Sequence, residues 1–240
     1  MKSYLFYLMA FSFQMAFSAG EWKVNAGYSR NHSPLLDNIH RNYAFTRLSN
    51  DSGVSLLRNG FFFQLGARFA NKKSFPVYTT MISWSRFAAS HSRPDFIDVA
   101  LHRINLLPAI GIDLWPEGKH GIHLSAGPIA GLHIFSVNKY AQPLQLEEGV
   151  SYRPAFFNWG IHTEGAYRFI WSKTQLAIFI QAEWFPVYYS GNYSSALSGT
   201  AYPWLADKGF AMNLNCGLSW ALPWKLNVSS DTSSSSEINK

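Results

Sequence analysis

Apolar and polar residues alternate along most of this chain, in eight separate segments. In the segment 157–171, for example, Phe157, Trp159 and Ile161 fall on one face, and Asn158 and His162 on the other. A period of two residues is typical of a β-strand with one apolar and one polar face. The pattern predicts strands at 21–29, 59–70, 77–87, 99–115, 121–135, 157–171, 175–185 and 210–224. Pro108 interrupts the fourth strand, and we expect a β-bulge there because proline cannot donate a ladder hydrogen bond.

The connections between these strands are of two kinds. Three are short (71–76, 116–120 and 172–174), and four are long (30–58, 88–98, 136–155 and 188–209). Four strands end on an aromatic residue with a lysine a few positions later, namely Phe69, Trp115, Trp171 and Trp224. Aromatic rings concentrate where a membrane meets water. Short turns on one side and long loops on the other are typical of outer-membrane barrels.

These observations predict an all-β protein, an eight-stranded antiparallel transmembrane β-barrel with short periplasmic turns and long extracellular loops. The longest loop, with Arg30, His32, His40, Arg41 and Arg47, is expected to face the medium and to meet a possible extracellular ligand.

Composition agrees with a barrel. Hydrophobic residues make up 48% of the chain, charged residues 14% and aromatic residues 17%, whereas soluble domains carry nearer a quarter charged residues. The apolar residues are spread out, which disfavours a helical membrane protein. The chain has one cysteine, Cys216, so it cannot form an intramolecular disulfide.

Three regions are expected along the chain. Residues 1–20 resemble a cleaved signal peptide, with Lys2, an apolar stretch from Tyr4 to Phe17 and small residues up to Gly20. Residues 21–226 would form the barrel, and 227–240, with serine at 233–236, a disordered tail. The expected location is therefore the outer membrane.

Over residues 21–224 the chain resembles the small outer-membrane barrels of Gram-negative bacteria, the class of the OmpA transmembrane domain and OmpX. The resemblance rests on strand number, loop asymmetry and aromatic strand ends. It implies outer-membrane lipid, lipopolysaccharide and the barrel-assembly machinery as partners. The machinery usually reads a final aromatic residue, which would be Trp224, although sixteen residues follow it.

Several charged and polar side chains fall on the inward faces of the predicted strands. An eight-stranded barrel is just wide enough for side chains to fill it, so buried charges must pair with one another. We expect a structural ion-pair and hydrogen-bond network of Arg68, His162, Glu164, Arg168, Gln181 and Glu183. The alternative is a proton path or a catalytic pair of Glu164 with Glu183.

One short motif suggests catalysis. His123-Leu124-Ser125-Ala126 is similar to the His-x-Ser-Asn core of outer-membrane lipid A deacylases, where a histidine activates a serine two residues on. Ala126 replaces the asparagine, and the motif lies near the periplasmic turn, away from outer-leaflet acyl chains. Filling of the lumen is therefore the preferred interpretation, and His123, Ser125 and Glu164 remain candidates only.

The remaining signals are weak. The net charge is +6, but the basic residues are dispersed, which favours contact with lipid headgroups over nucleic acid. The histidines lack ligand spacing, so neither a metal nor a cofactor is expected. The sequence thus favours a non-enzymatic barrel whose loops bind a partner or support envelope integrity. A lipid-modifying enzyme and a narrow solute channel are the alternatives.

Overall fold

The computed structural model describes residues 20–47, 57–71, 74–91, 96–115, 118–140, 150–171, 174–189 and 208–224. The elements are β1 (Gly20–His32), α2 (Pro34–Arg47), β2 (Asn59–Asn71), β3 (Ser74–His91), β4 (Phe96–Leu114), β5 (His120–Tyr140), β6 (Val150–Tyr152), β7 (Ala155–Trp171), β8 (Thr174–Tyr189) and β9 (Lys208–Trp224). The predicted signal peptide and the predicted tail lie outside these residues.

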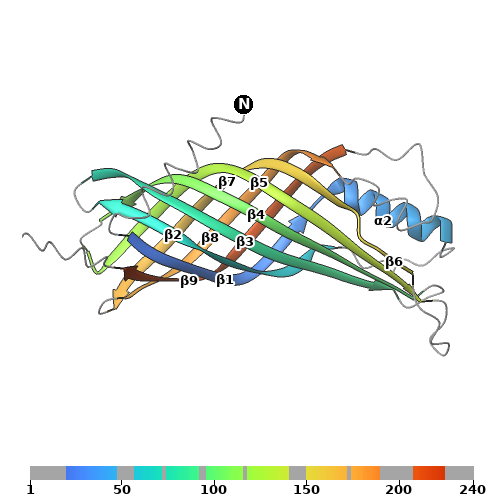
Figure 1. The fold of residues 1–240 in the computed structure, drawn as a ribbon, viewed down its shortest axis with the longest axis horizontal. Helices are drawn as coiled ribbons and strands as arrows, with labels where there is room; N and C mark the ends of the chain where they lie inside the picture. Colours follow the sequence, from blue (N-terminus) through green and yellow to red (C-terminus); the bar gives the residue numbers. More distant parts are fainter. Residues whose placement is uncertain are drawn as a thin grey trace, which may run out of the picture.

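Eight of the described strands close into a barrel. Each strand pairs antiparallel with its neighbours in the order β4-β3-β2-β1-β9-β8-β7-β5, and a further pairing of β4 with β5 joins the two edges. The three-residue strand β6 only extends the sheet beside β5. Figure 1 shows the tilted strands wrapping around one long axis. The prediction of an all-β, eight-stranded antiparallel barrel is confirmed.

The two ends of the barrel differ. Short connections join β2 to β3, β4 to β5 and β7 to β8 at one end, which we call the turn end; Gly20 and Trp224 pair there as well. The other end, the loop end, carries α2 and β6 (Figure 1). This division follows the predicted one.

Inside and outside follow the alternation of the sequence. On β8, Ile178 and Ile180 are exposed whereas Gln181 and Glu183 are buried. The same holds on β2, where Phe61, Phe63 and Leu65 point outward and Gln64 is fully buried. In a closed barrel the buried face is the lumen, so the interior contains the buried polar and charged side chains together with apolar ones, whereas the exterior is apolar.

Helix α2 corrects the prediction that residues 30–58 form a loop, because β1 continues to His32 and the helix spans Pro34–Arg47. Ser33 precedes the helix and its hydroxyl accepts a hydrogen bond from the Leu36 N–H, and Pro34 opens the first turn. Leu35, Leu36, Ile39 and His40 are buried on one face of the helix. No described helix has the length and apolar character needed to cross a membrane.

The strands also run further than expected at the loop end. The predicted loop 88–98 is largely strand, because β3 continues to His91 and β4 begins at Phe96. The predicted loop 136–155 likewise contains the end of β5 and all of β6. Three neighbouring strands are therefore long, with 18, 19 and 21 residues in β3, β4 and β5.

The bulge predicted at Pro108 is absent, since β4 keeps one register with β5 on both sides of it. The register places Pro108 opposite Pro128, so neither strand offers an N–H to the other at this point. The His162 imidazole Nε2 lies 3.1 Å from the Pro108 carbonyl oxygen. The His162 side chain reaches across Gly127, with which His162 pairs in the β5–β7 register. A Cβ atom at Gly127 would collide with the Pro108 carbonyl oxygen. A side chain thus supplies the contact that the backbone cannot make.

Candidate functional site

The lumen at the turn end is held by ion pairs. The Asp113 carboxylate accepts hydrogen bonds from the guanidinium groups of Arg68 and Arg168, the latter at 3.3 Å. Its other oxygen lies 2.8 Å from the His123 Nδ1. Arg68 also pairs with Glu21. We call Glu21, Arg68, Asp113, His123 and Arg168 the turn-end cluster.

A second buried pair lies beside this cluster. The Lys23 ammonium donates to the Glu164 carboxylate, and both side chains are almost completely buried. Together the two groups contain three cationic and three carboxylate side chains in addition to His123. Formal charges therefore balance inside the turn end, as burial of charge requires.

A cavity of about 30 Å³ opens among these side chains. Lys23, Arg68, His123 and Arg168 line it, along with Gln175 and Ser219. The His123 Nε2 and the Arg168 Nε are both buried and have no hydrogen-bond partner among the described residues. The cavity has the size of about one water molecule.

The middle of the lumen is filled by amides. Gln64 donates to the Gln181 side-chain oxygen at 2.7 Å and accepts from Asn25 at 2.8 Å. The Glu183 carboxylate is held by three amide groups, with donor distances of 2.9 to 3.3 Å, from Asn105, Asn213 and Asn215. Phe62 and Phe179 pack edge to face and form a small apolar cluster with Ala166 and Ala177. These contacts cross the barrel and leave its centre packed.

Near the loop end one cation lies among aromatic rings. Arg103 is fully buried, and its guanidinium carbon lies 5.0 Å, 5.7 Å and 5.6 Å from the ring centroids of Phe87, Phe185 and Tyr188. It donates to the Asn31 side-chain oxygen at 2.7 Å. Its Nε and one Nη have no partner among the described residues. No described carboxylate touches it.

Above Arg103 the lumen becomes apolar. Leu35, Leu36 and Ile39 of α2 join a buried cluster with Phe87, Leu101, Phe135, Tyr188 and Ala211, which come from the surrounding strands. Gly209 on β9 permits this approach, because a Cβ there would lie 3.0 Å from the Leu35 Cβ. The first turns of the helix thus pack into the loop end of the lumen.

The structure places all six residues of the expected network inside the barrel, but it pairs the charges differently from our expectation that Arg68 or Arg168 neutralises Glu164 or Glu183. The arginines contact Asp113, Glu164 contacts Lys23, and Glu183 is held by amides. Four further charged residues of the lumen, Glu21, Lys23, Arg103 and Asp113, were not expected in the network. Strand parity puts each of them on an inward face, so the signal was present.

The catalytic candidates also lie in the lumen. His123 is oriented by Asp113, and no hydrogen bond links it to Ser125 among the described residues. Ser125 lies opposite Glu164 in the β5–β7 register, yet Glu164 is occupied by Lys23. Glu183 has amide partners of its own, so the two glutamates are held separately. In the described residues no group of three metal-ligating side chains forms a metal site.

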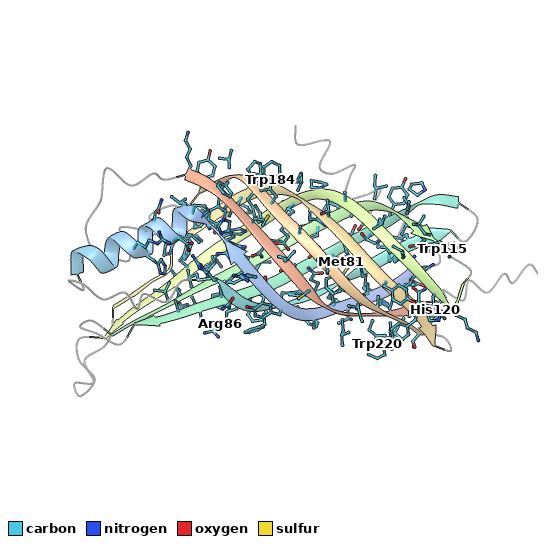
Figure 2. All side chains as sticks on the ribbon, turned by 180° about the vertical axis from the view of Figure 1, so that it is seen from behind. Met81, Arg86, Trp115, His120, Trp184 and Trp220 are labelled. Atoms are coloured by element: carbon cyan, nitrogen blue, oxygen red, sulfur yellow. The ribbon has the colours of Figure 1, made fainter. Side chains whose placement is uncertain are left out.

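Of the four expected interface aromatics, Trp115 is the best described. It is exposed, has a φ of 57°, and its carbonyl accepts a hydrogen bond from Arg168 at 3.3 Å. Figure 2 shows it at the turn end beside His120. Phe69 lies at the same end of β2, paired with Tyr78. The side chains of Trp171 and Trp224 lie outside the described residues.

The class of molecule is therefore a closed eight-stranded barrel with an apolar exterior, a filled lumen that is polar except near the loop end, and a helix at that end. No protein-family model matches the chain, and no curated protein matches it. Solved structures that align with it include Neisserial surface protein A, with 10% identity over 84% of this chain and 97% of that one and a TM-score of 0.44.

Two further outer-membrane barrels align in the same way. The attachment invasion locus protein Ail of Yersinia pestis has 11% identity over 86% of this chain and 100% of that one, with a TM-score of 0.36. The outer membrane protein OprG of Pseudomonas aeruginosa has 9% identity over 85% and 96%, with a TM-score of 0.41. Likeness at this level carries no information about the site, so the function must be argued from the barrel itself.

Proposed function

We propose that this protein is a non-enzymatic β-barrel of the outer membrane, anchored by its apolar exterior and built to present its loop end at the cell surface. The observation that carries the proposal is an outer belt of exposed large apolar side chains from all eight strands. It includes Trp22, Phe63, Ile82, Ile110, Leu124, Ile161, Ile178 and Leu218, several of them more than half exposed.

Water would be a poor solvent for this belt. Soluble monomers rarely expose contiguous apolar patches larger than a few hundred Å², and this belt surrounds the barrel. Lipid satisfies it, and the closed ladder leaves no strand edge unpaired within it. The same reasoning supports the orientation: the loop end faces the medium and the turn end the periplasm.

Two observations support a non-enzymatic role over the alternatives. His123 and Ser125 face the lumen, where acyl chains of a membrane lipid do not reach. The cross-barrel contacts of Gln64, Gln181 and Arg103 fill the interior, which disfavours a solute path. Membrane lipid, lipopolysaccharide and the barrel-assembly machinery remain the expected partners, and α2 would order the surface that meets an extracellular ligand or supports envelope integrity.

The membrane location can be tested by refolding the full chain into detergent or lipid vesicles. A closed barrel should migrate faster on an unboiled gel than on a boiled one, because its ladder has no free edge. Ile178→Arg should lower the free energy of unfolding by about 2–4 kcal/mol near the bilayer midplane, and Ile178→Val should change it little. Equal mobility of boiled and unboiled samples, or an Ile178→Arg variant as stable as Ile178→Val, would contradict the location.

The absence of catalysis needs a separate test. Lipid A from cells with and without the protein should have the same acyl chains by mass analysis. If lipid A loses an acyl chain in cells with the wild type but keeps it in cells with Ser125→Ala, the protein is a lipid-modifying enzyme instead. Ser125 is small and only partly buried, so this substitution should not disturb folding.

A further inference from the structure

Two neighbouring basic side chains lie on the outer wall of the barrel near its loop end, and a third lies two strands away. Arg86 of β3 lies directly opposite His102 of β4 in the antiparallel register, and both point outward. Arg153 is exposed just before β7, on the same side of the barrel, because the register pairs His102 with Ile134 of β5 and Ile134 with Ala155 of β7. Figure 2 shows Arg86 toward the end that carries α2, away from His120 and Trp115.

This basic group lies at the edge of the apolar belt. Trp84 and Ile104 lie two residues closer to the turn end, on the same outward faces of β3 and β4. Ile82 and Leu106 lie two residues further in the same direction. Ile82, Ile104 and Leu106 are exposed. The Trp84 ring stacks on His102, with centroids 6.1 Å apart and an interplanar angle of 28°. The wall therefore changes within a few residues from hydrocarbon, through an aromatic ring, to positive charge.

Among the described residues, this positive charge has no acidic partner. Neither Arg86 nor Arg153 forms an ion pair with any acidic side chain described in the structure, whereas Arg58, another arginine of the loop end, pairs with Asp37 at 3.0 Å. Arg86 and Arg153 carry permanent positive charges, and an anion between them would be attracted by both. The free guanidinium groups can each bind a phosphate with two parallel hydrogen bonds.

We propose that Arg86, His102 and Arg153 bind the phosphate group of an acylated lipid headgroup, whose acyl chains lie on Ile82, Ile104 and Leu106. An amphiphile with an anionic head and apolar tails fits a surface on which cations and an apolar face adjoin. This inference rests on the proposed membrane location, which puts the loop end in the outer leaflet. The phosphorylated glycolipid of that leaflet is the expected source, and a phospholipid is the other source of the same chemistry.

The test uses the full-length protein refolded in detergent and titrated with labelled lipid A. Arg86→Gln combined with Arg153→Gln should weaken binding by about thirtyfold, because each cation near an anionic headgroup contributes about one kcal/mol. Lys119→Gln is the matched control: Lys119 is also exposed but lies at the turn end, and its loss should change affinity less than twofold.

Two competitors identify the ligand. Lipid A without its phosphates should compete poorly with labelled lipid A, and equal competition by the dephosphorylated form would overturn the proposal. Competition by phosphatidylglycerol as strong as that by lipid A would support the phosphate site but name a phospholipid as its source.

The gel assay distinguishes a failure of the membrane location from a failure of the phosphate site. All variants should keep the shifted mobility of the folded barrel, since the substituted side chains are outside the core. A wild type without that shift would contradict the membrane barrel. A shifted, folded double variant that binds as tightly as the wild type would overturn the phosphate site alone.

Discussion

The two ends of the lumen are both filled by side chains, but the chemistry of those side chains differs. At the turn end, Asp113 gathers two arginines and a histidine, and nearly every charge has an opposite charge in contact. At the loop end, Arg103 has aromatic rings around it and no carboxylate in contact, and above it α2 packs into an apolar cluster. One end resembles an ionic lattice, and the other the core of a soluble protein.

The difference indicates what each end can tolerate. A buried ion pair is harmed most by losing one partner, because the other charge is left without compensation. An apolar cluster is harmed most by losing volume. Substitutions that remove a charge should therefore destabilise the turn end most. Substitutions that remove side-chain volume should destabilise the loop end most.

The largest effect is expected for Asp113→Asn. It keeps the side-chain shape but leaves Arg68, Arg168 and His123 without their shared carboxylate, which should cost about 3–5 kcal/mol in the free energy of unfolding. Urea unfolding in lipid vesicles measures it. Asp37→Asn removes the partner of the partly exposed Arg58 and should cost less than about 1 kcal/mol. Similar losses for the two variants would show that the turn end does not depend on its charges.

Leu36→Ala tests the loop end. Leu36 is 1% exposed in the apolar cluster, so its truncation should cost about 2–5 kcal/mol. Arg41→Ala changes an exposed position of the same helix and should stay within about 0.5 kcal/mol. If both variants unfold with the wild type, the helix contributes nothing to the stability of the barrel.

A double-mutant cycle on Lys23→Met and Glu164→Gln should give a coupling energy of about 0.5–3 kcal/mol, because the two side chains form a buried ion pair. The same cycle on Arg68 and Glu183 should be additive within about 0.5 kcal/mol, since these residues share no partner among the described residues. Strong coupling in the second cycle would mean that charges of the turn end extend into the middle layer.

The smallest effect is expected for Arg103→Met. Methionine fills the space among the rings, and Glu183 keeps its three amide donors, so the change in unfolding free energy should be about 1 kcal/mol or less. The corresponding Arg68→Met should be several times more costly. A large loss for Arg103→Met would identify Arg103 as the electrostatic counterpart of Glu183 despite the lack of contact.

Strand alternation alone predicted which face of each strand lines the lumen, because a period of two residues fixes the direction of every side chain once one is known. It could not predict the partners of the charges. Partners depend on height along the barrel axis, which is set by the register between strands. Lys23 meets Glu164 from a distant strand only because the barrel closes in the observed register.

The departures from prediction have local causes. Pro108 was expected to force a bulge, but Pro128 opposite it removes the same donor, so both strands keep their register. Helix α2 was overlooked although Ser33 and Pro34 form a recognisable start and Leu35, Leu36 and Ile39 recur at helical spacing. Long connections in barrels are expected to be irregular, so the helical pattern of this segment was interpreted as a loop.

The seam between β1 and β9 has a consequence for how the chain is made. It joins the first and last strands of the barrel through thirteen paired positions, from Gly20 with Trp224 to His32 with Met212. Until β9 has been synthesised, β1 and β8 are both open edges, able to pair with other chains. Closure of the seam joins the most distant parts of the sequence, the slowest kind of contact to form. A nascent chain therefore needs protection from self-association until its last strand is available.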